Sequence, residues 1–223
     1  FRYFWDTTNP RNGLVPDRWP TPSFASIAAV GFGLSAYPIG MARGWITRAQ
    51  ARDRVLATLR FFRDAPQGPA PAGTAGHRGF FYHFLDPRTG HRHARDVELS
   101  TVDTALLLAG AMHCQQVFDG ADAPEAEIRE AVRRIVDRVD WPWAQHRPPS
   151  ICHGWLPEKG FIASDWKGYN EAMLVYLLAL GSATHPVGPE AWREWTSTYG
   201  RSWQSFQGRE HLHFPPLFGH QYS

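Results

Sequence analysis

The chain contains 223 residues, a length that fits one domain with a sizeable buried core. Its composition, 43% hydrophobic and 20% charged, is that of a folded globular protein and not of a disordered segment. Lys and Arg number 23 against 21 Asp and Glu, so the net charge of +2 excludes a broad basic surface for nucleic acid. The longest apolar runs, residues 105–112 and 172–180, are too short to span a membrane, and we expect no signal peptide within this chain.

Hydrophobic periodicity predicts helices of two kinds that alternate along the chain. Helices of the first kind are apolar on nearly every side, which is typical of buried helices. They span residues 23–39, 100–118 and 166–180. Helices of the second kind are amphipathic or polar, and the first of them opens with a capping box from Thr47 to Gln50. They span residues 47–63, 124–139 and 189–199.

This alternation of inner and outer helices predicts an all-α fold, a ring of helical hairpins of which only part is present. We expect residues 1–223 to form a single domain that is truncated at its C-terminus, because a closed ring needs more helix pairs. The apolar faces at the open edge are expected to be covered by self-association or by the remainder of a longer chain. A short β-hairpin is predicted near residues 79–97, where 79–85 would pair with 91–97.

The ten tryptophans are an unusual number, and several lie in Gly- and Pro-rich connections. Trp155 and Trp166 are two of these, and flat apolar rings beside carboxylates are typical of a sugar-binding cleft. The alternative for each ring is packing within the core. The histidines and the two cysteines show no metal-ligand spacing, and no nucleotide-binding motif is present. We therefore expect neither a metal site nor a cofactor.

Most acidic residues lie on the amphipathic helices, where solvent exposure is expected. Asp96, Glu98 and Asp103 instead surround the start of a predicted inner helix, and Glu171 lies in the first turn of the next one. Hydrolysis of a glycosidic bond needs two carboxyl groups across a cleft, and these positions open onto the centre of the predicted ring. The competing interpretation is helix capping, because Ser100 and Asp103 form an S-x-x-D pattern and carboxylates are stabilised near helix N-termini.

Several long strings resemble the glycoamylase (glucoamylase-like) domain family, which includes bacterial endo-β-1,2-glucanases and a domain of cyclic β-1,2-glucan synthases. The strings are SFASIAAVGFGLSAYPIGMARGWITRAQA, GFFYHFLD, ELSTVDTALLLAG, GYNEAMLVYLLALGSATHPV and PLFGHQYS. They are spread along nearly the whole chain. The resemblance implies an (α/α)6 toroid, in agreement with the helix alternation. It also implies further helices after the last string, so that only the N-terminal half of the toroid would be present.

The resemblance also implies roles for particular residues. Glu171 matches a glutamate that is essential in the family and is the expected proton donor, and Asp103 matches an acidic pocket position. These two are the predicted catalytic residues. Ser100 stands where some relatives carry Asp, which bears on the identity of the substrate. The resemblance also implies a further essential carboxylate after residue 223, so this sequence is not expected to contain the full catalytic pair. The residues predicted to bind substrate are Asp96, Tyr82, His83, Trp155, Trp166, Tyr169, His220 and Gln221.

The function implied by the resemblance is a glycoside hydrolase that acts on a β-glucan, with β-1,2-glucan as the expected substrate. Two alternatives stay open: a transglycosylase domain of a glucan-cyclising protein, and a non-catalytic glucan-binding toroid. The expected partner is an oligo- or polysaccharide, and the expected location is periplasmic or secreted. Nucleic acid and insertion of this chain into a membrane are not expected.

Overall fold

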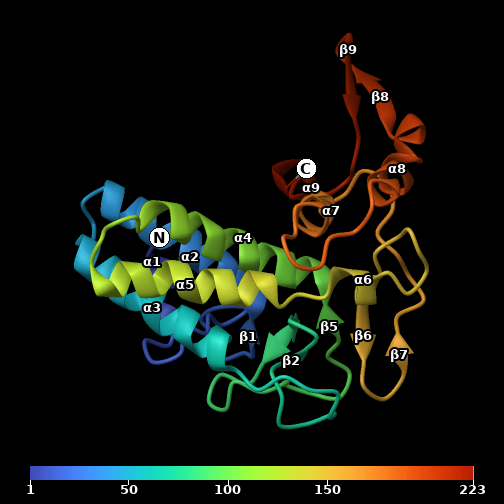
Figure 1. Ribbon diagram of the computed structural model, residues 1–223. Coiled ribbons are helices and arrows are strands. Elements are labelled where there is room, and N and C mark those ends of the chain that lie inside the picture. The colour runs from blue at the N-terminus through green and yellow to red at the C-terminus, as the bar shows by residue number, and fades with distance from the viewer. Residues whose placement is uncertain (223) are drawn as a thin grey trace.

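A computed structural model describes residues 1–222, which are mostly helical, as predicted, with small antiparallel sheets (Figure 1). The two most buried helices, α2 (Ile27–Ala42) and α4 (Thr101–Val117), pack against each other. The amphipathic helices α3 (Arg48–Asp64) and α5 (Ala123–Asp137) form a second packed pair. These four long helices lie within a few residues of their predicted ranges.

Side chains at the helix starts explain where the helices begin. Thr47 and Gln50 form the predicted capping box at α3, and the Ser26 hydroxyl accepts a hydrogen bond from the N–H of Ala29 at α2. In α5 the buried side chains, Ile128 among them, follow one stripe of the helix. The amphipathic character predicted for this helix is therefore confirmed.

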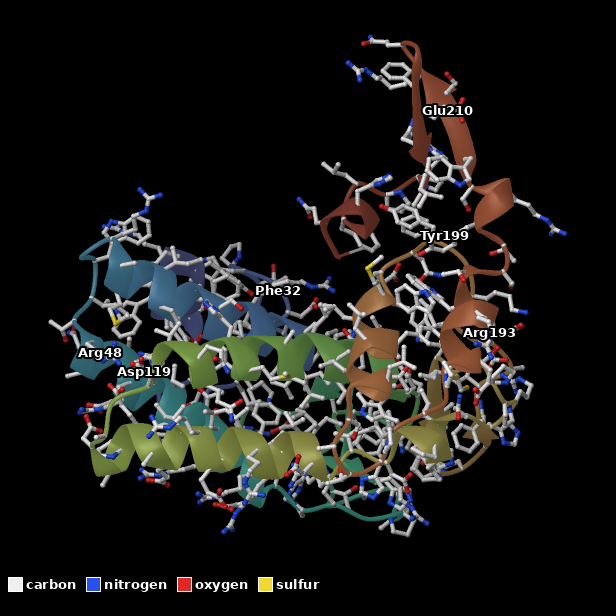
Figure 2. The ribbon with its side chains drawn as sticks, turned by 45° about the horizontal axis from the view of Figure 1, so that its top comes forward. Phe32, Arg48, Asp119, Arg193, Tyr199 and Glu210 are labelled. Carbon is white, nitrogen blue, oxygen red and sulfur yellow. The ribbon has the colours of Figure 1, made fainter. Side chains whose placement is uncertain are left out.

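Ion pairs fasten α3 to α5. The Arg48 guanidinium donates to both carboxylate oxygens of Glu125 at 2.7 Å each, and it lies 3.5 Å from Asp119 (Figure 2). The hydrogen bond from Arg48 holds the pKa of Glu125 below its ordinary value. Glu125 is buried, although its place on an amphipathic helix predicted exposure, because Arg48 reaches across from the neighbouring helix to pair with it.

The two buried helices approach so closely that glycine is needed where they touch. A Cβ atom on Gly31 would lie 2.3 Å from the carbonyl oxygen of Leu106. A Cβ atom on Gly110 would lie 2.1 Å from the carbonyl oxygen of Gly31. The backbones of α2 and α4 are therefore in direct contact, which only residues without a side chain allow.

The connections between helices form sheets that the all-α prediction did not include. The largest is a five-stranded antiparallel sheet with the order β2–β3–β5–β6–β7. Its strands are β2 (Gly76–His77), β3 (Phe80–Tyr82), β5 (Leu99–Ser100), β6 (Gly154–Leu156) and β7 (Gly160–Phe161). Strands of two or three residues are too short to show a polar–apolar alternation, so the sequence pattern could not reveal them. The all-α class is corrected to a mostly helical fold with small sheets.

The hairpin predicted near residues 79–97 is present only beside its turn, where Leu85 bridges Arg92. Further along, the partners differ from the prediction. β4 (Phe84–Leu85) pairs with β1 (Ala25–Ser26), and β3 pairs with β5. Because β1 runs directly into α2 and β5 into α4, this pairing fixes the starts of both buried helices next to the sheets.

The third buried helix is shorter than predicted, since α7 (Met173–Leu180) begins at Met173 and not at residue 166. Gly168 has a φ angle of +81°, a left-handed conformation that interrupts a continuous helix. The Asn170 side chain then accepts a hydrogen bond from a backbone N–H two residues later, which is a side-chain turn. Glu171 therefore lies in a turn before α7, and the prediction that it occupies the first turn of the helix was wrong.

Shorter elements complete the described chain. They are α1 (Arg2–Thr7), α6 (Trp141–Ala144), α8 (Glu190–Thr196), the 3-10 helix η1 (Tyr199–Arg201), β8 (Trp203–Phe206), β9 (Arg209–Leu212) and α9 (Gly219–Tyr222). The β8–β9 hairpin, which carries Glu210, projects away from the helices (Figure 2). Within residues 1–222, no helix combines the length and the apolar character needed to cross a membrane.

Candidate active site

A pocket of about 390 Å³ lies where the sheet meets the starts of α4 and α7. Each polar side chain of the lining sits just before or at the beginning of a strand or helix. Four predicted site residues are brought together in this lining: Glu171, Asp103, His83 and Trp166. The lining also contains Glu98, which the sequence pattern singled out as an unusual carboxylate, and His153, which it did not.

Asp103 is held by the first turn of α4. Its N–H donates to the Ser100 hydroxyl oxygen at 3.2 Å, which caps the helix, and the Ser100 hydroxyl donates to the Asp103 carboxylate. The Asp103 side chain is only 12% exposed. This burial raises the pKa of Asp103, although the charge of His83 and the bond from Ser100 act in the opposite direction. The capping interpretation therefore applies to Ser100, while the carboxylate of Asp103 belongs to the pocket wall.

His83 lies between two carboxylates of the same pocket. Its Nδ1 atom is 2.8 Å from Oε1 of Glu98, and its Nε2 atom is 3.5 Å from Oδ1 of Asp103. Burial lowers the pKa of His83, but the bond to Glu98 and the charges of both carboxylates outweigh it, so the pKa is raised. The ligand atoms of these three residues lie within 4.8 Å of one another, as those of a metal site would. We interpret the group as an imidazole held between two carboxylates, because Nδ1 is hydrogen-bonded to Glu98 and Nε2 lies at ion-pair distance from Asp103.

Trp166 supplies the aromatic part of the lining. Its indole N–H donates to the Thr101 hydroxyl oxygen at 2.9 Å, and its ring stacks on His153 with 3.8 Å between ring centroids. Burial lowers the pKa of His153, and the negative charges of Asp165 and Glu171 oppose this. The half-buried Glu171 thus lies near enough for its negative charge to act on the pKa of His153. One sequence feature could have singled out His153: it lies in the loop of Trp155, whose aromatic residues were expected to line a sugar-binding cleft.

Three predicted substrate-binding residues lie elsewhere. Tyr82 is fully buried in the hydrophobic core. Trp155 packs edge-on against Trp143, with 5.8 Å between ring centroids. Asp96 lines an adjoining hollow of about 350 Å³, which shares Glu98 with the main pocket. The roles of these residues stay predictions.

The segment around α9 approaches the same pocket. Phe218 is part of the lining, and the Tyr169 hydroxyl lies 3.1 Å from Nδ1 of His220, which joins this segment to the loop before α7. Gln221 is exposed. Tyr169, His220 and Gln221 therefore lie beside the lining, and their predicted contacts with substrate stay predictions.

The sequence similarity to known proteins covers most of the chain. The family described as "Putative glucoamylase" matches residues 163–223, the part that contains Glu171. An exo β-1,2-glucooligosaccharide sophorohydrolase (non-reducing end) from Parabacteroides distasonis is 27% identical over 220 residues. The match covers 94% of this chain and 29% of that protein.

Two solved structures share the fold. A "putative glucoamylase" from Bacteroides fragilis has a TM-score of 0.83 at 27% identity, covering 99% of this chain and 55% of that one. A β-1,2-glucanase from Parabacteroides distasonis has a TM-score of 0.79 at 26% identity, covering 89% and 28%. The chain thus spans between 28% and 55% of these relatives. It has the fold of glucoamylase-like proteins, and its resemblance to the glycoamylase family is confirmed.

Proposed function

We propose that this protein is a glycoside hydrolase that cleaves β-1,2-glucan by acid–base catalysis. The observation that carries the proposal is one pocket in which the carboxyl groups of Asp103 and Glu171 lie together with that of Glu98 and with the ring of Trp166. Hydrolysis of a glycosidic bond needs such a carboxyl pair, and an aromatic ring offers an apolar surface to a sugar. The sophorohydrolase and the β-1,2-glucanase among the relatives support β-1,2-glucan as the substrate class.

We assign Glu171 as the proton donor to the leaving oxygen and Asp103 as an acidic group of the same pocket that takes part in catalysis. Acid–base catalysis works best when the group that transfers the proton has a pKa near the working pH. Burial moves the pKa of Asp103 in that direction. Asp103 would therefore bind and release a proton more readily near neutral pH than an exposed aspartate.

The natural full-length protein, incubated with linear β-1,2-glucan, tests the proposed function. Short linear oligosaccharides, identified by chromatography and mass spectrometry, are the expected products. Cyclic products would instead indicate a transglycosylase domain of a glucan-cyclising protein, and binding without turnover would indicate a glucan-binding toroid. Starch serves as the second substrate, and cleavage of starch alone would contradict the proposed linkage.

Substitution of Trp166 is expected to weaken substrate binding. Trp166→Leu removes the flat ring and should raise KM for glucan about 2- to 10-fold, the range expected for loss of one aromatic contact. Trp166→Phe keeps a ring and should leave KM within about twofold of the wild-type value. Steady-state kinetics of the natural full-length protein measure both variants.

The control for this experiment is Trp195→Leu, because Trp195 is a fully buried tryptophan of α8 outside the pocket lining. It should lower the melting temperature and leave KM unchanged. A Trp166→Leu protein with a lowered melting temperature and an unchanged KM would show that Trp166 only packs the loop.

Asp96 is expected to matter for long substrates. The hollow that it lines shares Glu98 with the main pocket, so a glucan chain that leaves the pocket there would reach Asp96. Asp96→Asn should raise KM about tenfold for long oligosaccharides, since a hydrogen bond to a charged group contributes about 1.5–3 kcal/mol. KM for the disaccharide-sized substrate should not change. An equal effect on short and long substrates would contradict this extended cleft.

We also propose that the helix layers are part of an (α/α)6 toroid. Leu177, Trp203 and Phe206 expose apolar surface on α7 and the β8–β9 hairpin, and such surface is typical of an interface. Further helices or a second copy of the chain would cover it. Light scattering of the 223-residue chain should report a self-associated species. A monodisperse monomer that binds no hydrophobic dye would contradict this proposal. We further propose that the protein is periplasmic or secreted, which cell fractionation tests.

A further inference from the structure

Four polar side chains of the pocket form a continuous chain of contacts. Glu98 faces Nδ1 of the His83 ring, and Oδ1 of Asp103 faces Nε2 of the same ring. The other carboxylate oxygen of Asp103, Oδ2, accepts a hydrogen bond from the Ser100 hydroxyl. Glu98 and Asp103 therefore occupy opposite ends of one imidazole ring. A ring held in this way can exchange a proton with a carboxyl group at either nitrogen.

The fold locks the ring of His83 in place. His83 lies between β3 and β4, where its N–H donates to the carbonyl of Glu98 at 2.9 Å and its carbonyl accepts from the N–H of Ile27 at 3.2 Å. The imidazole also stacks on Phe84, with 3.8 Å between ring centroids. The backbone, the stacked ring and Glu98 thus fix the direction in which Nε2 points.

We propose that His83, held by Glu98, is a positioning residue for Asp103 that exchanges one proton with the Asp103 carboxyl group. The inference rests on the proposed function, because it makes the carboxyl pair of that site depend on a third group. In one state the imidazolium donates to both carboxylates. In the other, the Nε2–H bond has broken and an O–H bond has formed on Asp103, while Nδ1–H still donates to Glu98.

The exchange needs no further reactant and little movement. When the proton moves from Nε2 to Oδ1, the N–H bonding pair becomes a lone pair on Nε2, and a lone pair of Oδ1 forms the new O–H bond. The 3.5 Å contact between them has to shorten by a few tenths of an ångström, as catalytic hydrogen bonds often do when substrate binds. Asp103 can then receive a proton from the substrate or give one to it, and exchange with Nε2 of His83 returns the Asp103 carboxyl group to its starting protonation state.

The charges around His83 favour the protonated ring. The negative groups that act on it are Glu98, Asp103 and Asp17, which come from the segment before β5, from α4 and from the loop before β1. His153 lies in the same pocket lining, and burial lowers its pKa. His83 and Asp103 act on each other's charge, since the Asp103 carboxylate helps to raise the pKa of His83 and the charge of His83 opposes the rise in the pKa of Asp103.

The pH dependence of kcat, measured with the natural full-length protein on linear β-1,2-glucan, tests the proposal. Glu98→Gln keeps an acceptor for Nδ1–H but removes a charge that raises the pKa of His83, so the alkaline limb should shift by about one pH unit or more to lower pH. His83→Gln should abolish that limb and lower kcat on the order of 100-fold, the cost of a reacting group misplaced by about 1 Å. His113→Gln, on the exposed side of α4, is the matched control and should change neither quantity.

A purely structural role would lower kcat in Glu98→Gln and leave the limb where it is, and that result overturns the proposal. NMR titration of the His83 imidazole gives a readout that does not need turnover. Its pKa should fall in Asp103→Asn, and an unchanged value likewise overturns the proposal. A wild-type protein that leaves β-1,2-glucan intact would contradict the proposed function alone, because the titration still reports whether the Asp103 carboxylate acts on the proton of the His83 imidazole.

Discussion

Glu171→Gln in the natural full-length protein is expected to lower kcat on β-1,2-glucan by at least ~10²-fold, the usual contribution of a general acid. The amide has the size of the glutamate side chain but cannot give a proton to the leaving oxygen. The fold should persist, because Glu171 lies in the turn before α7 and is only half-buried. Initial rates over a range of substrate concentrations separate kcat from KM, and thermal melting checks the fold.

A substrate with an activated leaving group sharpens this test. An aryl sophoroside needs little protonation to lose its aryl group, so Glu171→Gln should lose much less activity on it than on glucan. Glu190→Gln, the same substitution at an exposed position of α8, is the control and should have wild-type rates on both substrates. Near-normal kcat on glucan in Glu171→Gln would show that Glu171 is a turn carboxylate and nothing more.

Gly31→Ala is expected to lower the free energy of unfolding by about 1–3 kcal/mol, the usual cost of forcing extra atoms into a packed core. The new Cβ would lie 2.3 Å from the carbonyl oxygen of Leu106, which is backbone and cannot rotate away. α2 and α4 would have to separate. At about 2–4 °C per kcal/mol for a domain of this size, the melting temperature should fall by about 2–12 °C.

Gly33→Ala is the matched control, because it lies two residues away in the same helix. Its Cβ would meet the Phe4 ring and the Tyr37 hydroxyl at 3.4 Å, an ordinary contact distance. Alanine is favoured over glycine in a helix by about 1 kcal/mol, so this variant should be neutral or more stable. Urea unfolding of both variants measures the difference. Equal stability of the two would show that the close approach at Gly31 is not what limits the packing of α2 on α4.

Local patterns in the sequence were sufficient for the four long helices. A segment that is apolar on nearly all sides has no face for solvent, so residues 23–39 and 100–118 had to be buried. The capping box at Thr47 also depends only on residues within one turn. For the candidate site, the position of Asp103 beside a helix start and the family-like sequence around Glu171 were enough to predict that both are catalytic residues.

Contacts between distant segments decided the rest. The strands of the largest sheet are two or three residues long, so no periodicity within one strand could reveal them, and β5 pairs with β3 and β6 across long stretches of chain. The start of α7 depends on the left-handed turn at Gly168. The resemblance placed Tyr82 among the substrate-binding residues, whereas the packing of β3 places it in the core.

The sequence by itself determined where the four long helices lie, which of these are buried, and which carboxyl groups stand apart from the solvated faces. Only the tertiary structure decided that His83 meets Glu98 and Asp103, because the backbone bond between His83 and Glu98 joins segments on either side of a turn and a loop. Periodicity within one element is a local property that a sequence displays directly. The apposition of side chains follows from how separate elements pair so that buried backbone groups find hydrogen-bond partners, and that pairing exists only in the folded chain.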